Sequence, residues 1–138
     1  MAYWLIKTEP DDWSWAEQVA KGKKGEPWTG VRNAQARNFI REMKKGDLAF
    51  FYHTGGEKRV VGVVKVTKEA YQDPTTDDER WLVVDVVAVE DLPKPVTLAD
   101  IKAEEKLAEM VLVRNFRLSV QPVTAAEWKH VRKMGGLK

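Results

Sequence analysis

Short apolar runs alternate with polar, glycine- and proline-containing segments along the whole chain. Runs rich in valine and aromatic residues predict strands, since such side chains suit a pleated, buried surface. The predicted strands cover 3–7, 48–53, 60–67, 81–89 and 118–123. Because three of these strands follow one another without intervening helices, the pattern predicts an α+β domain and argues against a βαβ array.

Helices are predicted where a capping residue precedes a stripe of apolar positions. Ser14 and Thr124 are each followed three residues later by glutamate, which is the capping-box signature, and Asn33 is a favoured N-cap. The expected helices cover 15–20, 33–44 and 124–133, with one or two shorter ones within 96–110. The buried stripe of the second helix is expected to consist of Ala36, Phe39, Ile40 and Met43.

The two long valine-rich strands set the expected architecture. Their composition favours strands that are buried on both faces or that close into a barrel. We therefore expect residues 1–138 to form a single α+β domain, a small and mostly antiparallel β-barrel flanked by short helices. A chain of 138 residues can bury one core without metal or disulfide crosslinks.

Composition removes most catalytic chemistry. The chain has no cysteine, which excludes disulfides, thiolate metal sites and cysteine nucleophiles, and its two histidines show no ligand spacing. Dinucleotide-binding, P-loop and nucleophile-elbow motifs do not occur. The sequence thus predicts a protein that is not an enzyme and that carries no metal and no cofactor.

The same features bear on location. No run approaches the roughly 20 apolar residues of a membrane helix, and the first apolar run lacks the preceding basic stretch of a signal peptide. The absence of cysteine fits a reducing compartment. We expect a monomer without membrane contact, cytoplasmic in a bacterium or nuclear in a eukaryote.

Charge is unevenly distributed although the net charge is only +2. The segment 32–45 is basic, with Arg32, Arg37 and Arg41 among its cations, whereas 73–80 is acidic. A basic segment on a nearly neutral protein indicates one side that faces an anion such as nucleic acid. A solvated helix face would explain the same residues.

Six tryptophans in so short a chain point to a stacking site. Trp28 stands in a loop just before the helix that Asn33 caps, where an indole could stack on a base. Thr29 and Asn33 could then bind the edge of that base, and Arg32 and Arg37 its phosphates. The alternative is that Trp28 fills the core and Asn33 only caps the helix.

The remaining tryptophans are expected to serve mainly in packing. Trp4 and Trp81 lie within predicted strands and are expected in the core. Trp13 and Trp15 flank the start of the first helix, where one should pack on the helix and the other could lean toward a pocket.

The first strand reads YWLIKTEP and the tryptophan loop reads WTGVRNAQARNF. These and further segments resemble the EVE domain, a member of the PUA-like superfamily of nucleic-acid-binding folds, so the resemblance implies a PUA-like barrel. The resemblance covers nearly the whole chain, in segments 3–10, 28–39, 43–47, 51–54 and 117–123. Ala34 departs from the pattern, because an aromatic residue is expected there.

The EVE domain is in turn similar to the YTH domain, a reader of methylated adenine in RNA. This resemblance implies that Trp28 is one wall of an aromatic cage and that Lys7 and Thr8 form its floor or rim. It implies a second aromatic wall from a later loop, for which Tyr71 is the candidate. Further implied residues are Tyr52 or His53 at the mouth and a strand-holding group of Arg114, Arg117 and Ser119.

Three hypotheses follow. The first is a non-catalytic domain that holds a modified base of DNA or RNA, for example a methylated one, in the aromatic pocket. The second is a nucleoside-binding protein or enzyme that uses the same pocket. The third is a protein-interaction module, for which the basic segment would be incidental.

Overall fold

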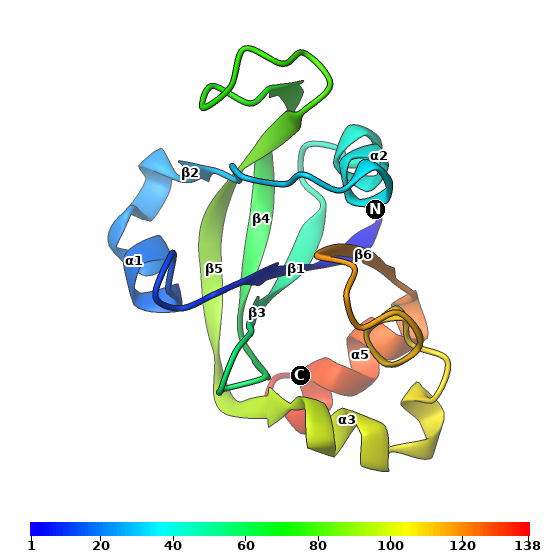
Figure 1. The fold of residues 1–138 in the computed structure, drawn as a ribbon. Helices are drawn as coiled ribbons and strands as arrows, with labels where there is room; N and C mark the ends of the chain where they lie inside the picture. The colour runs from blue at the N-terminus through cyan, green and yellow to red at the C-terminus, as the bar shows by residue number, and fades with distance from the viewer.

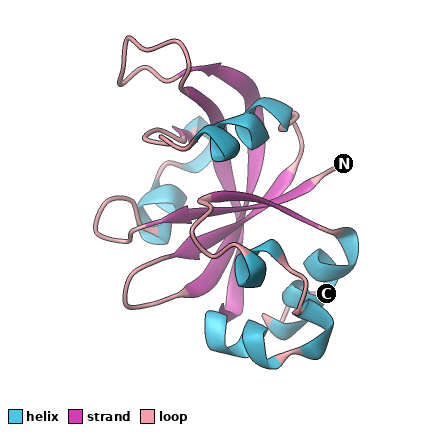
Figure 2. Cartoon of the chain, turned by 45° about the vertical axis from the view of Figure 1, so that its right-hand side comes forward, coloured by secondary structure: helices cyan, strands magenta, loops and turns pink.

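The structure, a computed structural model, describes residues 1–138 and contains one six-stranded sheet with helices on both faces (Figures 1 and 2). The strand order is β2-β5-β4-β3-β1-β6, and all neighbours are antiparallel except β1 and β3. The strands are β1 (Tyr3–Thr8), β2 (Glu26–Pro27), β3 (Leu48–His53), β4 (Arg59–Gln72), β5 (Leu82–Thr97) and β6 (Val120–Val123).

Five α-helices and two single turns of 3₁₀-helix connect the strands. They are α1 (Trp15–Ala20), η1 (Gly22–Lys24), α2 (Ala34–Glu42), α3 (Leu98–Ala103), η2 (Glu105–Leu107), α4 (Val111–Arg114) and α5 (Ala125–Met134). The predicted capping boxes at Ser14 and Thr124 are confirmed, and the Asn33 side chain accepts a bond from the Ala36 N–H at 2.9 Å. The capping signals therefore located three helix starts correctly.

The strands β4 and β5 are much longer than predicted. They form a hairpin of 14 and 16 residues whose register shifts at four places, which bends the pair. Val96 and Thr97 pair with β4 again beyond a stretch of β5 that contains Pro93 and Pro95, and sequence periodicity does not record such pairing. Three short elements, β2, η1 and α4, were not predicted.

The predicted α+β class is confirmed, but the predicted barrel does not close. The edge strands β2 and β6 do not pair with each other, and each contains a proline, Pro27 or Pro122, which cannot donate to a further strand. The sheet instead buries both faces under separate helices. One core lies under α1 and α2, and the other lies under the C-terminal helices, which gather at the lower end of Figure 1.

The helix α1 is fixed to the sheet by Trp15. Its indole ring packs edge-on against Phe51 at a centroid distance of 5.1 Å and covers Gly62 of β4. The Trp15 backbone N–H donates to Nε2 of His53 at 3.0 Å, and its indole N–H donates to the Asp91 carboxylate at 2.6 Å. Trp15 thus contacts three neighbouring strands.

This contact predicts that Gly62→Ala destabilises the protein. A Cβ atom at Gly62 would overlap the Trp15 ring, and relief of such overpacking costs about 1–3 kcal/mol. Urea unfolding measures the loss. Gly56→Ala is the matched control, because a Cβ there meets no atom within 4 Å and the free energy of unfolding should change by less than about 0.5 kcal/mol. Equal stability of the two variants would contradict the packing argument.

Candidate functional site

A pocket of about 460 Å³ opens beside the first core. Three segments form it: the end of β1 with its following loop, the loop from β2 to α2, and Ser119 just before β6. This volume lies within the range of small-ligand sites and is large enough for one nucleobase. Of the predicted site residues, the pocket brings together Lys7, Thr8, Trp28, Thr29, Arg32 and Ser119.

Trp28 is both part of the core and part of the pocket wall. Its side chain is only 6% exposed and meets the Phe51 ring edge-on at a centroid distance of 5.4 Å. The Trp28 backbone N–H donates to the Val84 carbonyl at 2.9 Å, which ties the loop to β5. Trp28 therefore packs in the core, as one of its two interpretations expected, and the small part of it that is exposed lines the pocket.

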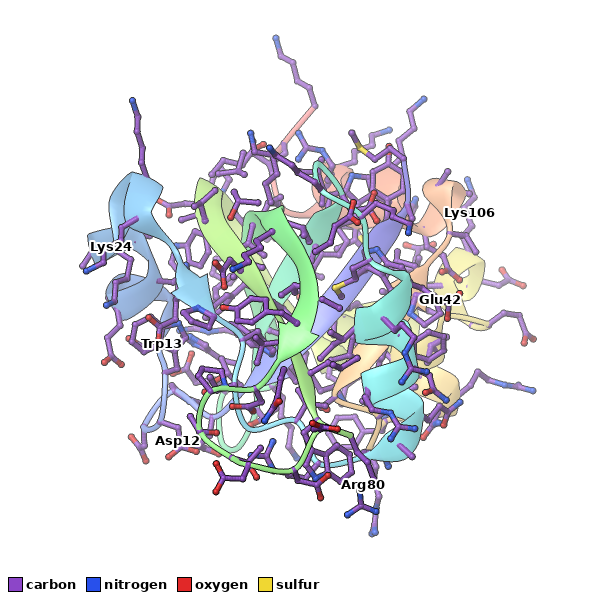
Figure 3. All side chains as sticks on the ribbon, turned by 90° about the horizontal axis from the view of Figure 1, so that it is seen from above. Asp12, Trp13, Lys24, Glu42, Arg80 and Lys106 are labelled. Carbon is purple, nitrogen blue, oxygen red and sulfur yellow. The ribbon has the colours of Figure 1, made fainter.

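Trp13 supplies a second aromatic group to the lining. Its indole N–H donates to the side-chain oxygen of Gln18 at 2.9 Å, and the amide nitrogen of this fully buried Gln18 donates to the Val86 carbonyl at 3.1 Å. The Thr8 hydroxyl also donates to the Trp13 carbonyl at 3.0 Å. Trp13 is therefore fixed in orientation. Figure 3 shows Asp12 and Trp13 on the same flank of the molecule, opposite Lys106.

The pocket has a mixed charge. Lys7 and Arg32 contribute cations, the loop after β1 contributes the carboxylates of Glu9 and Asp12, and β2 contributes that of Glu26. The Lys7 side chain is directed toward Phe116, where its amino group donates to the backbone carbonyl, and burial lowers the pKa of this amine to about 8. Lys7 thus remains mainly protonated near pH 7, and both signs of charge are available to a ligand.

A buried carboxylate fastens the tryptophan loop. Asp73, whose side chain has no exposed surface, accepts bonds from the Gly30 N–H and the Arg32 guanidinium, each at 3.0 Å, and from the N–H and hydroxyl of Thr75. Burial alone would raise the pKa of Asp73, but the bonds from Thr75, Gly30 and Arg32 outweigh it and lower the pKa to about 2. Asp73, which the sequence analysis missed, joins the β4–β5 loop to the pocket.

Three predicted residues on or beside α2 lie outside the pocket lining. The Asn33 side chain caps α2, and Arg37 and Arg41 bond to the Asn38 side chain on the outer surface of that helix. Arg37 also lies 5.7 Å from the ring centre of Trp81. Trp81 was expected in the core but is only half-buried, with Arg32 and Arg80 also near its ring.

The remaining aromatic candidates also lie elsewhere. Tyr52 is fully buried in the second core, across the sheet from Trp28, and burial raises the pKa of its hydroxyl to about 12. His53 uses both ring nitrogens, one for Trp15 and the other for Glu57 at 2.9 Å. Tyr71 bonds to Asp85 within the β4–β5 hairpin. The structure thus puts Trp13 in the lining, where the resemblance had suggested Tyr71.

The basic pair before β6 is exposed. Arg114 lies 3.6 Å from the Glu109 carboxylate, and Arg117 is solvent-exposed next to Phe116. Both flank the loop that leads to Ser119 in the pocket. No group of three or more His, Asp or Glu side chains is arranged to hold a metal ion. None of the helices combines the length and apolar character needed to cross a membrane.

The family follows from the sequence match. The model of the EVE domain family matches residues 2–134. The chain belongs to the EVE domain family. Human thymocyte nuclear protein 1 is 35% identical to this EVE domain over an alignment that covers 94% of the chain and 72% of that protein. The family resemblance seen in the sequence is therefore confirmed.

Solved structures agree with this assignment. A protein of Agrobacterium tumefaciens is 54% identical, with a TM-score of 0.97 and coverage of 99% of this chain and 94% of that chain. Human THYN1, solved in complex with 5-methylcytosine-containing DNA, is 33% identical, with a TM-score of 0.91 and coverage of 100% and 99%. The YTH domain of Zygosaccharomyces rouxii MRB1 shares the fold, with 18% identity, a TM-score of 0.61 and coverage of 99% and 88%.

Asp73 gives this EVE domain a predictable response to acid. Because its folded-state pKa lies below the unfolded value of about 3.9, its contribution is complete above about pH 4 and is lost as the pH falls toward 2. Asp73→Asn should lower the free energy of unfolding at pH 7 by about 1–3 kcal/mol, since donors lose a charged acceptor. Urea unfolding from pH 7 to pH 2 measures this difference, which should shrink in acid.

The exposed Asp77→Asn is the control for the same acidic loop and should leave the profile unchanged. If Asp73→Asn and the wild type differed by the same amount at pH 7 and pH 2, the carboxylate of Asp73 would not hold the loop as described.

Proposed function

We propose that this EVE domain is a non-catalytic binder of nucleic acid that takes one modified base into the pocket between Trp13 and Trp28. The observation that carries the proposal is that two indoles from different loops line one base-sized pocket, each fixed by buried neighbours. The complex of the related human THYN1 with 5-methylcytosine-containing DNA supports it.

The energies are compatible with extraction of a base. Flipping a base out of a duplex costs a few kcal/mol. Stacking on the half-buried Trp13 returns about 1–3 kcal/mol, and contact with the small exposed part of Trp28 and hydrogen bonds to the polar lining add to it. A methyl group adds about 0.8 kcal/mol of apolar contact, enough for a several-fold preference for the methylated base.

The polar lining suits the edge of a base that carries an amino group. Carboxylates accept hydrogen bonds, and Glu9 and Asp12 lie in the lining. The hydroxyl groups of Thr29 and Ser119 can donate or accept, so they can pair with ring nitrogens or a carbonyl. Cytosine and adenine each present an exocyclic amino group beside an acceptor nitrogen, whereas thymine and uracil do not.

The cations outside the pocket would contact the backbone of the bound strand. Arg32 lies at the rim, and Arg37 and Arg41 continue from it along α2 without a carboxylate partner. Arg114 and Arg117 are exposed in the segment that leads to Ser119, which lines the pocket. Contacts of this kind to the phosphate backbone make the affinity fall as the salt concentration rises. The slope of the logarithm of affinity against the logarithm of salt concentration therefore measures the number of phosphate contacts.

Trp13→Ala is the sharpest test. Trp28→Ala would open a core cavity and cost about 3–5 kcal/mol of stability, whereas Trp13 is half-buried and its removal should leave the fold intact. The affinity for an oligonucleotide with one 5-methylcytosine should fall about 5- to 150-fold, the equivalent of one lost stacking contact. Calorimetric titration at two salt concentrations measures the affinity and its salt dependence.

The slope of affinity against salt should not change in Trp13→Ala, because no phosphate contact is removed. Trp13→Phe is the matched variant and should recover most of the affinity. Unchanged binding by Trp13→Ala would contradict the proposal. Equal, salt-independent affinity for a free nucleoside and an oligonucleotide would instead indicate a small-molecule site.

A further inference from the structure

Phe116 is an exposed aromatic side chain that the pocket does not use. Four large apolar residues of the chain are exposed, namely Met1, Val19, Val89 and Phe116, and Phe116 is the only aromatic one. Its exposed fraction is 39%, in the loop between α4 and β6. Single exposed apolar side chains are common on protein surfaces, so the groups that surround this ring decide whether it has a binding role.

The ring lies just beyond the rim of the pocket. The Lys7 amino group is 4.1 Å from the centre of the Phe116 ring and donates to the Phe116 carbonyl. Lys7 itself lines the pocket, and so does Ser119, three residues after Phe116. The loop between α4 and β6, which carries Phe116, therefore borders the pocket at Lys7 and Ser119.

The loop is held in place by a buried side chain. The amide nitrogen of Gln121, which has no exposed surface, donates to the carbonyls of Asn115 at 3.3 Å and Leu118 at 2.7 Å. The Leu118 N–H also donates to the Asn115 carbonyl at 3.2 Å. Phe116 thus projects from a braced turn, which lowers the entropy cost of using it as a contact surface.

The surroundings of the ring are basic. Arg117 follows it directly and is exposed. Arg114, the last residue of α4, is also exposed, and its guanidinium lies 3.6 Å from the exposed Glu109 carboxylate. A flat aromatic face among cations is the combination that proteins use for single-stranded nucleic acid, in which bases stack and phosphates pair with arginine. An apolar protein partner would not account for the cations.

We propose that Phe116 is a second stacking platform, on which the nucleotide next to the one in the pocket rests. The inference depends on the proposed function of the pocket and adds to it a partner of defined form. That partner is a strand of at least two nucleotides whose bases are unstacked from each other at the pocket rim. Arg117 would meet the phosphate that joins the two nucleotides.

The test compares a free nucleoside with a short strand. Binding of 5-methyl-2′-deoxycytidine and of a single-stranded trinucleotide with a central 5-methylcytosine is measured for the wild type and Phe116→Ala. The variant should bind the trinucleotide about 5- to 150-fold more weakly, the loss expected from one stacked base, and should bind the nucleoside as the wild type does. Phe116→Tyr should retain the trinucleotide affinity, and Val89→Ala, an exposed apolar position on β5, is the control.

Unchanged trinucleotide binding by Phe116→Ala would overturn the inference. So would an equal loss for nucleoside and trinucleotide, because Phe116 would then act only by holding Lys7 at the pocket. Failure of the proposed function looks different: the wild type would bind neither ligand, or Trp13→Ala would bind both as the wild type does.

Discussion

The buried ring of Phe51 is the contact on which the rest of the site depends. It lies in β3, at the centre of the sheet, and receives the edges of Trp15 and Trp28 at centroid distances of 5.1 and 5.4 Å. Trp15 positions α1, and α1 carries the Gln18 that orients Trp13. Phe51 therefore positions both tryptophans of the pocket lining, Trp28 directly and Trp13 through Trp15 and Gln18. This explains how Trp13 and Trp28 can be fixed although they lie in loops.

The open sheet explains how a core residue can also line a pocket. A closed barrel would have one interior, and a tryptophan inside it would be inaccessible from the solvent. Here the first core ends at the short edge strand β2, and the loop after Pro27 turns back over it with Trp28. Asp73 then fixes the far end of this loop through Gly30 and Arg32. The pocket is the space left between the rim of the core and these tethered loops.

Local features of the fold were predictable from sequence, and features that depend on distant contacts were not. The starts of α1, α2 and α5 follow from side chains that bond to their own first turn, so Ser14, Asn33 and Thr124 identified them. The length of β5 and the open edges depend on pairing between strands. The residues of the candidate site also fall into a predictable and an unpredictable group. Trp28 could be named as a candidate from its loop and from the family resemblance, and it lines the pocket.

Which of Trp13 and Trp15 packs on the sheet depends on Gly62, because the Trp15 ring occupies the space that a Cβ atom at this position would fill. Asp73 was not predicted because it belongs to an acidic segment, 73–80, of the kind that usually lies exposed to solvent. Its signal was the following proline and Thr75, which are typical of a turn in which the aspartate bonds to nearby backbone. Phe116 left no signal in the pattern, because exposure of a single ring is decided by the packing of the whole loop.

A crystal structure of this EVE domain with an oligonucleotide that carries one 5-methylcytosine tests the proposed pocket most directly. We expect the modified base to lie between Trp13 and Trp28, with its edge toward the polar lining. A complex in which that base remains stacked in its strand, or lies outside the pocket, would contradict it.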